Sequence, residues 1–147
     1  MRATIIELGT RVYQRERDSV RALLTMPLIY SLTLPFVLLD LWVTAYQWIC
    51  FPLYGIRRVA RRRYFAFDRH QLPYLTLLER ANCSYCSYAN GVIAYVREVA
   101  ARTEQYWCPI KHRAALPDPH RRYQRFIEYG DARAYHRGTG HLRRSLR

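Results

Sequence analysis

The stretch LLTMPLIYSLTLPFVLLDLWVTAYQWICFPLYGI, residues 23–56, decides the fold class because it is apolar almost throughout. Asp40 is its only charged residue. A helix that crosses the hydrocarbon core of a bilayer needs about 20 mainly apolar residues, and this stretch is longer than one upright span. No other part of the chain is apolar enough to surround such a segment as a buried core. The sequence therefore predicts a membrane segment over residues 23–56.

The number of passages through the membrane stays open. Pro27, Pro35 and Pro52 interrupt helical hydrogen bonding, which favours kinks or a re-entrant turn. One long kinked span fits this pattern, and so does a short hairpin with its turn near Pro35 to Asp40. An acid at membrane depth is costly unless it faces protein or a turn, so Asp40 is either a functional acid or a residue that meets a helix break or a partner helix.

The placement of arginine predicts the orientation. The net charge is +13, and Lys111 is the only lysine. Arginines are concentrated just after the apolar stretch, which predicts that the C-terminal part lies on the inner side of the cytoplasmic membrane. In that position they are expected to contact anionic lipid head groups. The predicted lipid-contacting residues are Arg57, Arg58, Arg61, Arg62 and Arg63.

The rest of the chain predicts helices and no strands, hence an all-α, membrane-anchored protein. Residues 1–22 fit an amphipathic helix, residues 57–112 a small cytoplasmic helical hairpin, and residues 113–147 a basic, partly disordered tail. The first helix of the hairpin is expected from about His70 to about Cys83, with Asp68 as its N-cap. The second is expected after a turn at Asn90–Gly91, and Pro109 ends it.

The tail is expected to contain one short helix before its disordered part. Asp118 is the predicted N-cap, Pro119 the first helical residue and Gly130 the stop. From Asp131 on, the dense arginines predict a disordered basic segment.

Four side chains have the composition of a metal site. Cys83 and Cys86 form C-x2-C, and Cys108 and His112 form C-x3-H. Both spacings let two ligands reach one ion, and Cys3His is a common structural zinc set. An iron–sulfur cluster could use the same ligands, and Cys108–Pro109 is a weak signal for haem. Cytosolic cysteines stay reduced, and inert packed thiols are the alternative to any metal.

Helix geometry limits the metal hypothesis. A continuous helix over residues 91–107 is about 25 Å long and would hold Cys108 far from Cys86. The four ligands can share one ion only if this helix ends early or if two protomers share the metal. An antiparallel hairpin predicts a different cluster at one end, formed by His70, Cys108 and His112.

The motifs NCSYCSYANG, residues 82–91, and RTEQYWCPIKH, residues 102–112, carry a resemblance. From about Leu41 to His112 the chain resembles a family of small bacterial membrane proteins. That family has no assigned activity, so the resemblance implies a bacterial membrane protein and no mechanism.

The expected function is that of a membrane-anchored accessory or adaptor protein with a metal-stabilised cytoplasmic domain. We find no nucleophile–base pair, phosphate-binding loop or paired carboxylates in the sequence, so an enzyme is the less favoured class. A membrane redox protein with an iron–sulfur cluster or haem is the alternative. Lipids and another membrane protein or a second copy are the expected partners. Specific nucleic-acid binding and a small-molecule substrate are not indicated.

Overall fold

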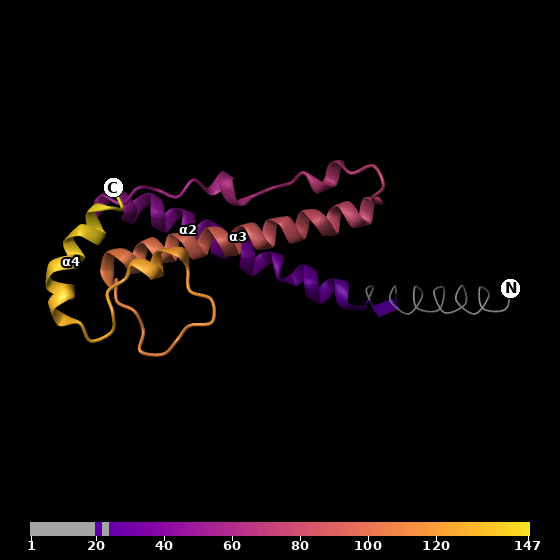
Figure 1. Cartoon of the computed structure of the whole chain (residues 1–147). Helices are drawn as coiled ribbons and strands as arrows, with labels where there is room; N and C mark the ends of the chain where they lie inside the picture. Colours follow the sequence, from indigo (N-terminus) through magenta and orange to yellow (C-terminus); the bar gives the residue numbers. More distant parts are fainter. Residues whose placement is uncertain (1–19, 22–23) are drawn as a thin grey trace, which may run out of the picture. The chain divides into compact units, whose positions relative to one another are not determined.

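The computed structural model describes residues 20–21 and 24–147. The predicted helix over residues 1–22 therefore lies almost entirely outside the described residues. The chain divides into two compact units, residues 1–36 and 37–147, and each is described by itself below. In the described ranges the regular structure is helical, apart from one isolated bridge between Ile110 and Ile127, which confirms the all-α prediction (Figure 1).

One helical run, Leu24–Leu53, is long and apolar enough to cross a membrane. Its second part is helix α2, Thr33–Leu53. A turn at Leu32 precedes α2: the Leu32 N–H bonds to the Ile29 carbonyl at 3.3 Å. The break fits Pro35, which has no N–H to donate to the preceding turn. The described residues 24–53 are thus helical with one turn at Leu32, and the number of passages through a membrane stays a prediction.

The longest helix is α3, Leu77–Trp107, and it begins at a capping box. The Glu79 N–H donates to the Thr76 hydroxyl at 3.3 Å, and the Thr76 N–H donates to the Glu79 carboxylate at 2.8 Å. The predicted start at His70 with Asp68 as N-cap is wrong: a short 3-10 turn, η2 (Arg69–Gln71), stands there, and the Asp68 side chain caps nothing. Pro73 lies inside the predicted helix and disfavours it. The predicted end before Pro109 is confirmed.

The predicted turn at Asn90–Gly91 is wrong, because both residues lie inside α3. A Cβ atom on Gly91 would stand 2.8 Å from the Tyr64 carbonyl oxygen and from Phe65 Cδ1. This glycine therefore allows the chain before α3 to pass close to the helix. The Asn90 side chain donates to the Cys86 carbonyl at 2.8 Å, one helical turn back.

The helical hairpin predicted for residues 57–112 is wrong, because α3 runs through Asn90–Gly91 without a turn. Helices α2 and α3 run in the same direction (Figure 1). Residues 54–76, which we call the return segment, run back alongside α3 before that helix begins (Figure 1). They contain two short 3-10 turns, η1 (Arg61–Tyr64) and η2. Later residues of α2 then meet later residues of α3: Thr44 bonds to Tyr95, and Tyr46 bonds to Thr103.

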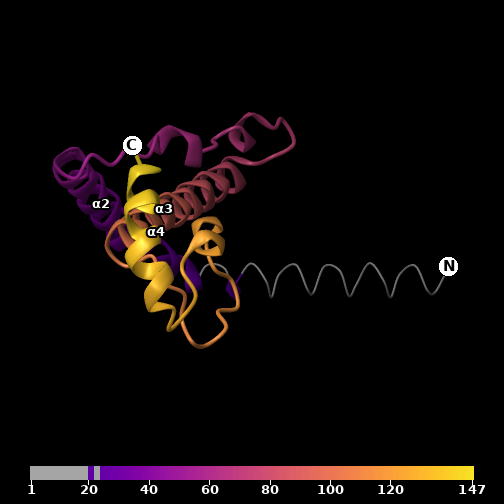
Figure 2. The same ribbon diagram turned by 60° about the vertical axis from the view of Figure 1, so that its left-hand side comes forward.

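The C-terminal part is ordered as helix, contrary to the disorder predicted from Asp131. A two-way backbone pairing joins residues 109–111 to Ile127, with the Lys111 N–H donating at 2.7 Å and the Ile127 N–H at 2.9 Å. The 3-10 helix η3 (Arg121–Arg125) has His120 as its N-cap, so the prediction of Asp118 as the N-cap is wrong. After Gly130, at φ +84°, helix α4 runs over Ala132–Arg144, with the Asp131 carboxylate as its N-cap. Figures 1 and 2 show α4 at the C-terminal end of α3.

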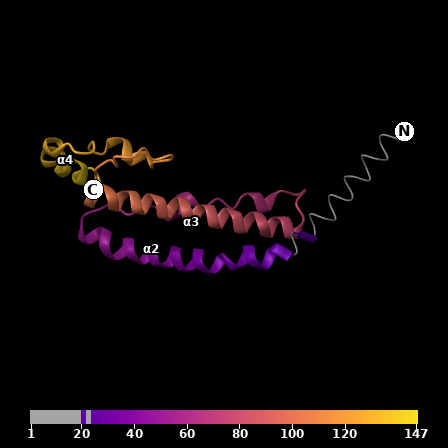
Figure 3. The same ribbon diagram turned by 90° about the horizontal axis from the view of Figure 1, so that it is seen from below.

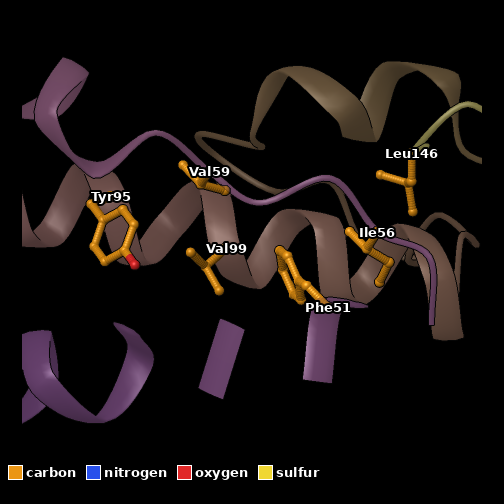
Figure 4. Packing of buried hydrophobic residues seen from close by; sticks show 6 residues of the cluster. All are labelled: Phe51, Ile56, Val59, Tyr95, Val99 and Leu146. Atoms are coloured by element: carbon orange, nitrogen blue, oxygen red, sulfur yellow. The ribbon is translucent and has the colours of Figure 1, made fainter. Parts of the chain in front are cut away.

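The core lies where the end of α2, the return segment, α3 and the C-terminal residues meet (Figure 4). Phe51 and Tyr95 are fully buried, and Leu146 is 3% exposed. The Arg57 N–H donates to the Leu146 carbonyl at 2.8 Å. Leu146 thus fixes the end of the described chain in the core, and this contact explains why α4 is ordered. The complete cluster is Phe51, Ile56, Val59, Tyr95, Val99 and Leu146.

Candidate functional site

The side of α2 that faces α3 carries polar residues at helical spacing. Asp40, Thr44, Gln47 and Phe51 recur every three or four residues and so share one side of the helix. Asp40 is 5% exposed and Gln47 only 2%. Among the described residues, every buried side-chain nitrogen and oxygen has a hydrogen-bond partner. The protein-facing side of α2 is therefore polar and satisfied.

Asp40 is held by a bidentate ion pair. Arg61 donates from Nε to Oδ1 at 2.8 Å and from Nη2 to Oδ2 at 2.5 Å, and the Tyr88 hydroxyl donates to Oδ2 at 3.1 Å. Burial and the bond to Asp40 raise the pKa of Tyr88, so this phenol remains a donor at neutral pH. The Arg61 guanidinium also stacks on the Phe65 ring, 4.1 Å from its centroid. Asp40 therefore joins α2 to the return segment and to α3.

Gln47 forms a second polar connection. Its Oε1 accepts the Val59 N–H at 2.9 Å, and its Nε2 donates to the Val59 carbonyl at 3.3 Å. The same Nε2 donates to the Tyr95 hydroxyl at 2.6 Å, and Thr44 bonds to that hydroxyl at 3.2 Å. The amide thus satisfies the backbone of the return segment as a neighbouring strand would.

The opposite side of α2 is apolar and uncovered in this structure. Trp42 is 79% exposed, Leu53 78%, and Ile49 65%. This arrangement inverts the usual pattern of a surface helix in water, which turns its apolar side inward. We call this set the outer face of α2; its members are Leu38, Leu41, Trp42, Ala45, Ile49 and Leu53.

The outer face occupies one side of α2, and charged residues lie along the rest of the helix. Arg61 binds Asp40 in the first half of α2, and Arg58 stacks on the Trp48 ring, 3.7 Å from its centroid. Arg102 donates to the Arg57 carbonyl beyond the end of the helix. Charged residues thus accompany α2 from Asp40 to its end. Such a one-sided contact is typical of a helix at the boundary between membrane and water.

The five arginines expected at lipid head groups fall into two groups. Arg61 is occupied by Asp40, so its position is explained by the ion pair. Arg57, Arg58, Arg62 and Arg63 are exposed, and their contact with lipid stays a prediction.

The predicted metal ligands do not converge within one chain. Cys83 and Cys86 lie one turn apart in α3, whereas Cys108 follows the last residue of that helix. Twenty-two residues separate Cys86 from Cys108, or about 33 Å of helix. Within the described ranges, no group of three His, Cys, Asp or Glu side chains lies close enough to hold a metal ion. A metal shared between two chains stays a prediction.

The alternative cluster of His70, Cys108 and His112 is not formed either. His70 lies in η2, before the start of α3, and Cys108 follows its end. The antiparallel hairpin on which this cluster depended is absent because α3 is one continuous helix from Leu77 to Trp107 (Figure 3).

A polar network that the sequence did not indicate attaches the C-terminal part to α3. Glu98 Oε1 accepts from Arg102 Nε at 2.9 Å and from Arg122 Nη2 at 2.8 Å. Burial raises the pKa of Glu98, but the hydrogen bonds from Arg122 and Arg102 outweigh burial, so the pKa lies below its usual value. His120 Nε2 lies 2.8 Å from Glu104 Oε2. These residues position the chain for α4.

In the described residues, fold and site together define an all-α protein in which one helix is long and apolar enough to cross a membrane and in which α2 buries polar and exposes apolar side chains. Comparisons with protein-family models, with curated proteins and with solved structures find no match to this sequence. The arrangement of its own residues is therefore the basis for a functional proposal.

Proposed function

We propose that this chain is a membrane-anchored accessory protein without a catalytic centre, whose headpiece, residues 37–147, lies against the membrane surface through the outer face of α2. The observation that carries the proposal is the inversion of α2. Its buried side carries the hydrogen-bonded Asp40 and Gln47 together with Phe51, and its exposed side is apolar. Polar groups that face protein and apolar groups that face outward are the arrangement required by an apolar solvent.

The outer face is large enough to matter energetically. Removing a leucine, isoleucine or similar side chain from water is worth about 1.5–3 kcal/mol. Trp42, Ile49 and Leu53 each expose more than half of their surface, and exposed apolar groups of this size in one patch indicate an interaction site. Trp48 with its stacked Arg58 adds the aromatic and cationic pair that suits the head-group region.

The accessory role is supported by how the polar side chains are used. Asp40, Gln47 and Glu98, which would be candidates for chemistry in a buried site, each bind two or more groups that hold the fold together. They organise the headpiece and leave its surfaces for contact with lipid and with other proteins.

Quenching of tryptophan fluorescence by brominated lipid tests the membrane contact. We expect Trp42, as the only tryptophan after Trp48→Phe and Trp107→Phe, to be quenched more by bromine near the head groups than by bromine near the bilayer centre. Leu41→Glu with Ile49→Glu should reduce the quenching, whereas Ile93→Glu, on α3 and 52% exposed, should leave it unchanged. Absence of quenching from either depth contradicts the membrane contact.

The accessory role needs a separate measurement. After extraction in a mild detergent, we expect the chain to migrate as part of a larger assembly that includes another protein. A stable monomer that no other protein accompanies contradicts this part of the proposal and leaves the membrane contact intact.

A further inference from the structure

Helix α4 has one strongly basic side. Its charged residues follow a three- and four-residue spacing, which places them on one side of the helix. All of them are exposed. We call this set the basic face; its members are Arg133, His136, Arg137, His141 and Arg144.

The other side of α4 contacts α3 and Ile127, which precedes α4 in the chain. Gln105 Nε2 donates to the Leu142 carbonyl at 2.8 Å and to the Ser145 hydroxyl at 2.9 Å. Arg143 Nε donates to the Tyr106 carbonyl at 2.8 Å, and Gly138 lies beside the Ile127 side chain. These contacts and the buried Leu146 hold α4 in one orientation, so the basic face is a defined surface.

The charges of the basic face are not compensated within the headpiece. In the part of the chain that the structure describes, Arg133, Arg137 and Arg144 form no ion pair, although arginines elsewhere do, as Arg97 and Arg122 show. Like charges four residues apart on a helix destabilise it. An ordered helix that carries this repulsion is suited to an external anion.

The position of α4 argues against the membrane surface as that anion. Helix α3 lies between α2 and α4 in Figure 3, and α4 packs on α3. The outer face of α2, which we assign to lipid, therefore belongs to a different side of the headpiece.

The ends and composition of the basic face favour protein over nucleic acid. Asp131 is exposed at the N-terminal end of α4, where its carboxylate would repel a continuing phosphate backbone, whereas the neighbouring Glu128 is paired with Lys111. The aromatic rings among the members of the basic face are the imidazoles of His136 and His141, and no tyrosine, tryptophan or phenylalanine, the larger rings on which bases stack, is among them. Carboxylates at helical spacing match it, because arginine forks pair with carboxylate oxygens.

We propose that the basic face is the docking surface for an acidic helix of a partner protein. The inference rests on the accessory role proposed above and gives the chemistry of the partner. At about 1.5 Å per residue, the 13 residues of α4 offer roughly 20 Å of length, enough for three turns of a facing helix.

Binding of a synthetic helical peptide to the full chain in detergent tests the proposal. The peptide carries glutamates at the spacing of the basic face. A control peptide of the same length carries glutamine at these positions. We expect Arg133, Arg137 and Arg144→Gln, made together, to weaken binding of the glutamate peptide by about tenfold or more, since each tenfold corresponds to about 1.4 kcal/mol. Arg113, Arg121 and Arg125→Gln, three other exposed arginines, remove the same charge and should weaken it less than threefold, roughly the effect of net charge alone.

Several results overturn the inference. Equal weakening by the two triple variants shows that net charge alone acts. Tighter binding of duplex DNA than of the peptide, lost in the α4 variant, assigns the basic face to nucleic acid. Competition by nanodiscs of phosphatidylglycerol that depends on the same arginines assigns it to lipid. The triple Arg→Lys variant controls for folding, because it keeps the charge. If the α4 variant binds the peptide as the wild type does while Trp42 is still quenched, the docking proposal is wrong and the membrane contact is unaffected.

Discussion

Helices α2 and α4 both pack on α3, but they have opposite polarity. α2 buries Asp40 and Gln47 and exposes Trp42 and Ile49, whereas α4 turns its arginines outward and its small and apolar residues inward. The same helix α3 therefore supports one surface suited to an apolar medium and another suited to anions in water. This difference is what the membrane contact and the anion-binding surface proposed above require of one headpiece.

The largest expected effect concerns the residue that fixes α4 to the core. Leu146→Ala should destabilise the headpiece by about 3 kcal/mol, because a buried leucine is lost and a cavity remains beside Phe51. Denaturant unfolding in detergent measures the change. Leu116→Ala, at a leucine that is 42% exposed, is the control and should change stability by less than about 0.5 kcal/mol. Equal effects would show that Leu146 does not anchor α4.

The next effect concerns the polar side of α2. Asp40→Ala leaves the Arg61 guanidinium and the Tyr88 hydroxyl without their acceptor and should cost about 2–3 kcal/mol. This figure lies below that of a fully buried pair because the Arg61 side chain is 42% exposed. Asp118→Ala, at the exposed pair with Arg97, should cost less than about 1 kcal/mol. An Asp40 variant as stable as the Asp118 variant would refute the structural role of Asp40.

Two glycines compare a packed surface of α3 with an exposed surface of α4. Gly91→Ala should destabilise by about 1–3 kcal/mol, because its Cβ would stand 2.8 Å from a backbone oxygen. Gly140→Ala should stabilise by about 0.5–1 kcal/mol, because the nearest atom is the flexible end of Arg144 at 3.5 Å. Thermal unfolding of both variants provides the measurement, and changes of the same sign would contradict the packing described for Gly91.

The pH dependence of the C-terminal attachment follows from Glu98. Its pKa is lowered on folding, so the stabilising contribution is fully present above the unfolded value of about 4.3 and is lost as the pH falls through the folded value. We expect amide hydrogen exchange in residues 121–127 to be steady from about pH 7 to 5 after correction for intrinsic rates, and protection to fall below about pH 4. Glu98→Gln should show weakened protection at all these pH values; a pH profile like that of the wild type would rule out Glu98 as the cause.

The smallest expected effect concerns the cysteines. If a metal binds, two chains must share it, so Cys83→Ser and Cys108→Ser should change metal content and dimer content together. Elemental analysis with sedimentation measures both. Metal retained by a monomer and lost in both variants would contradict the separation of these residues along α3. Neither variant should alter the quenching of Trp42.

Part of the fold could be predicted from the sequence, because hydropathy and proline act locally. The apolar run, the all-α class and the end of α3 before Pro109 follow from such signals. The cap signal at Asp68 predicts too early a start for α3, because Pro73 disfavours a helix there. Asn90–Gly91 predicts a turn, whereas Gly91 instead makes room for Tyr64 and Phe65, which are distant in sequence. The parallel course of α2 and α3 depends on the return segment, which has no periodic pattern.

The sequence predicts only part of the candidate site. It indicates that Asp40 is costly at membrane depth, but it does not identify Arg61 as the partner of Asp40. Spacing alone does not show which arginine reaches the acid, so Arg61 is predicted to contact lipid with its neighbours. Thr44 and Gln47 were missed, although their four- and seven-residue spacing from Asp40 marks one side of a helix. In α4 the arginines and histidines also recur every three or four residues, a spacing that favours a helix. The high arginine content predicts disorder instead, and the buried contact of Leu146 explains why this segment is helical.

The buried polar side of α2 has a consequence for biosynthesis. The ribosome makes α2 before Arg61, Tyr88 and Tyr95, so the nascent helix carries an acid and an amide that do not yet have their native partners. Their desolvation in lipid would cost several kcal/mol in the meantime. Under the membrane contact proposed above, deep insertion of residues 37–53 is therefore opposed until Arg61 and α3 have been made.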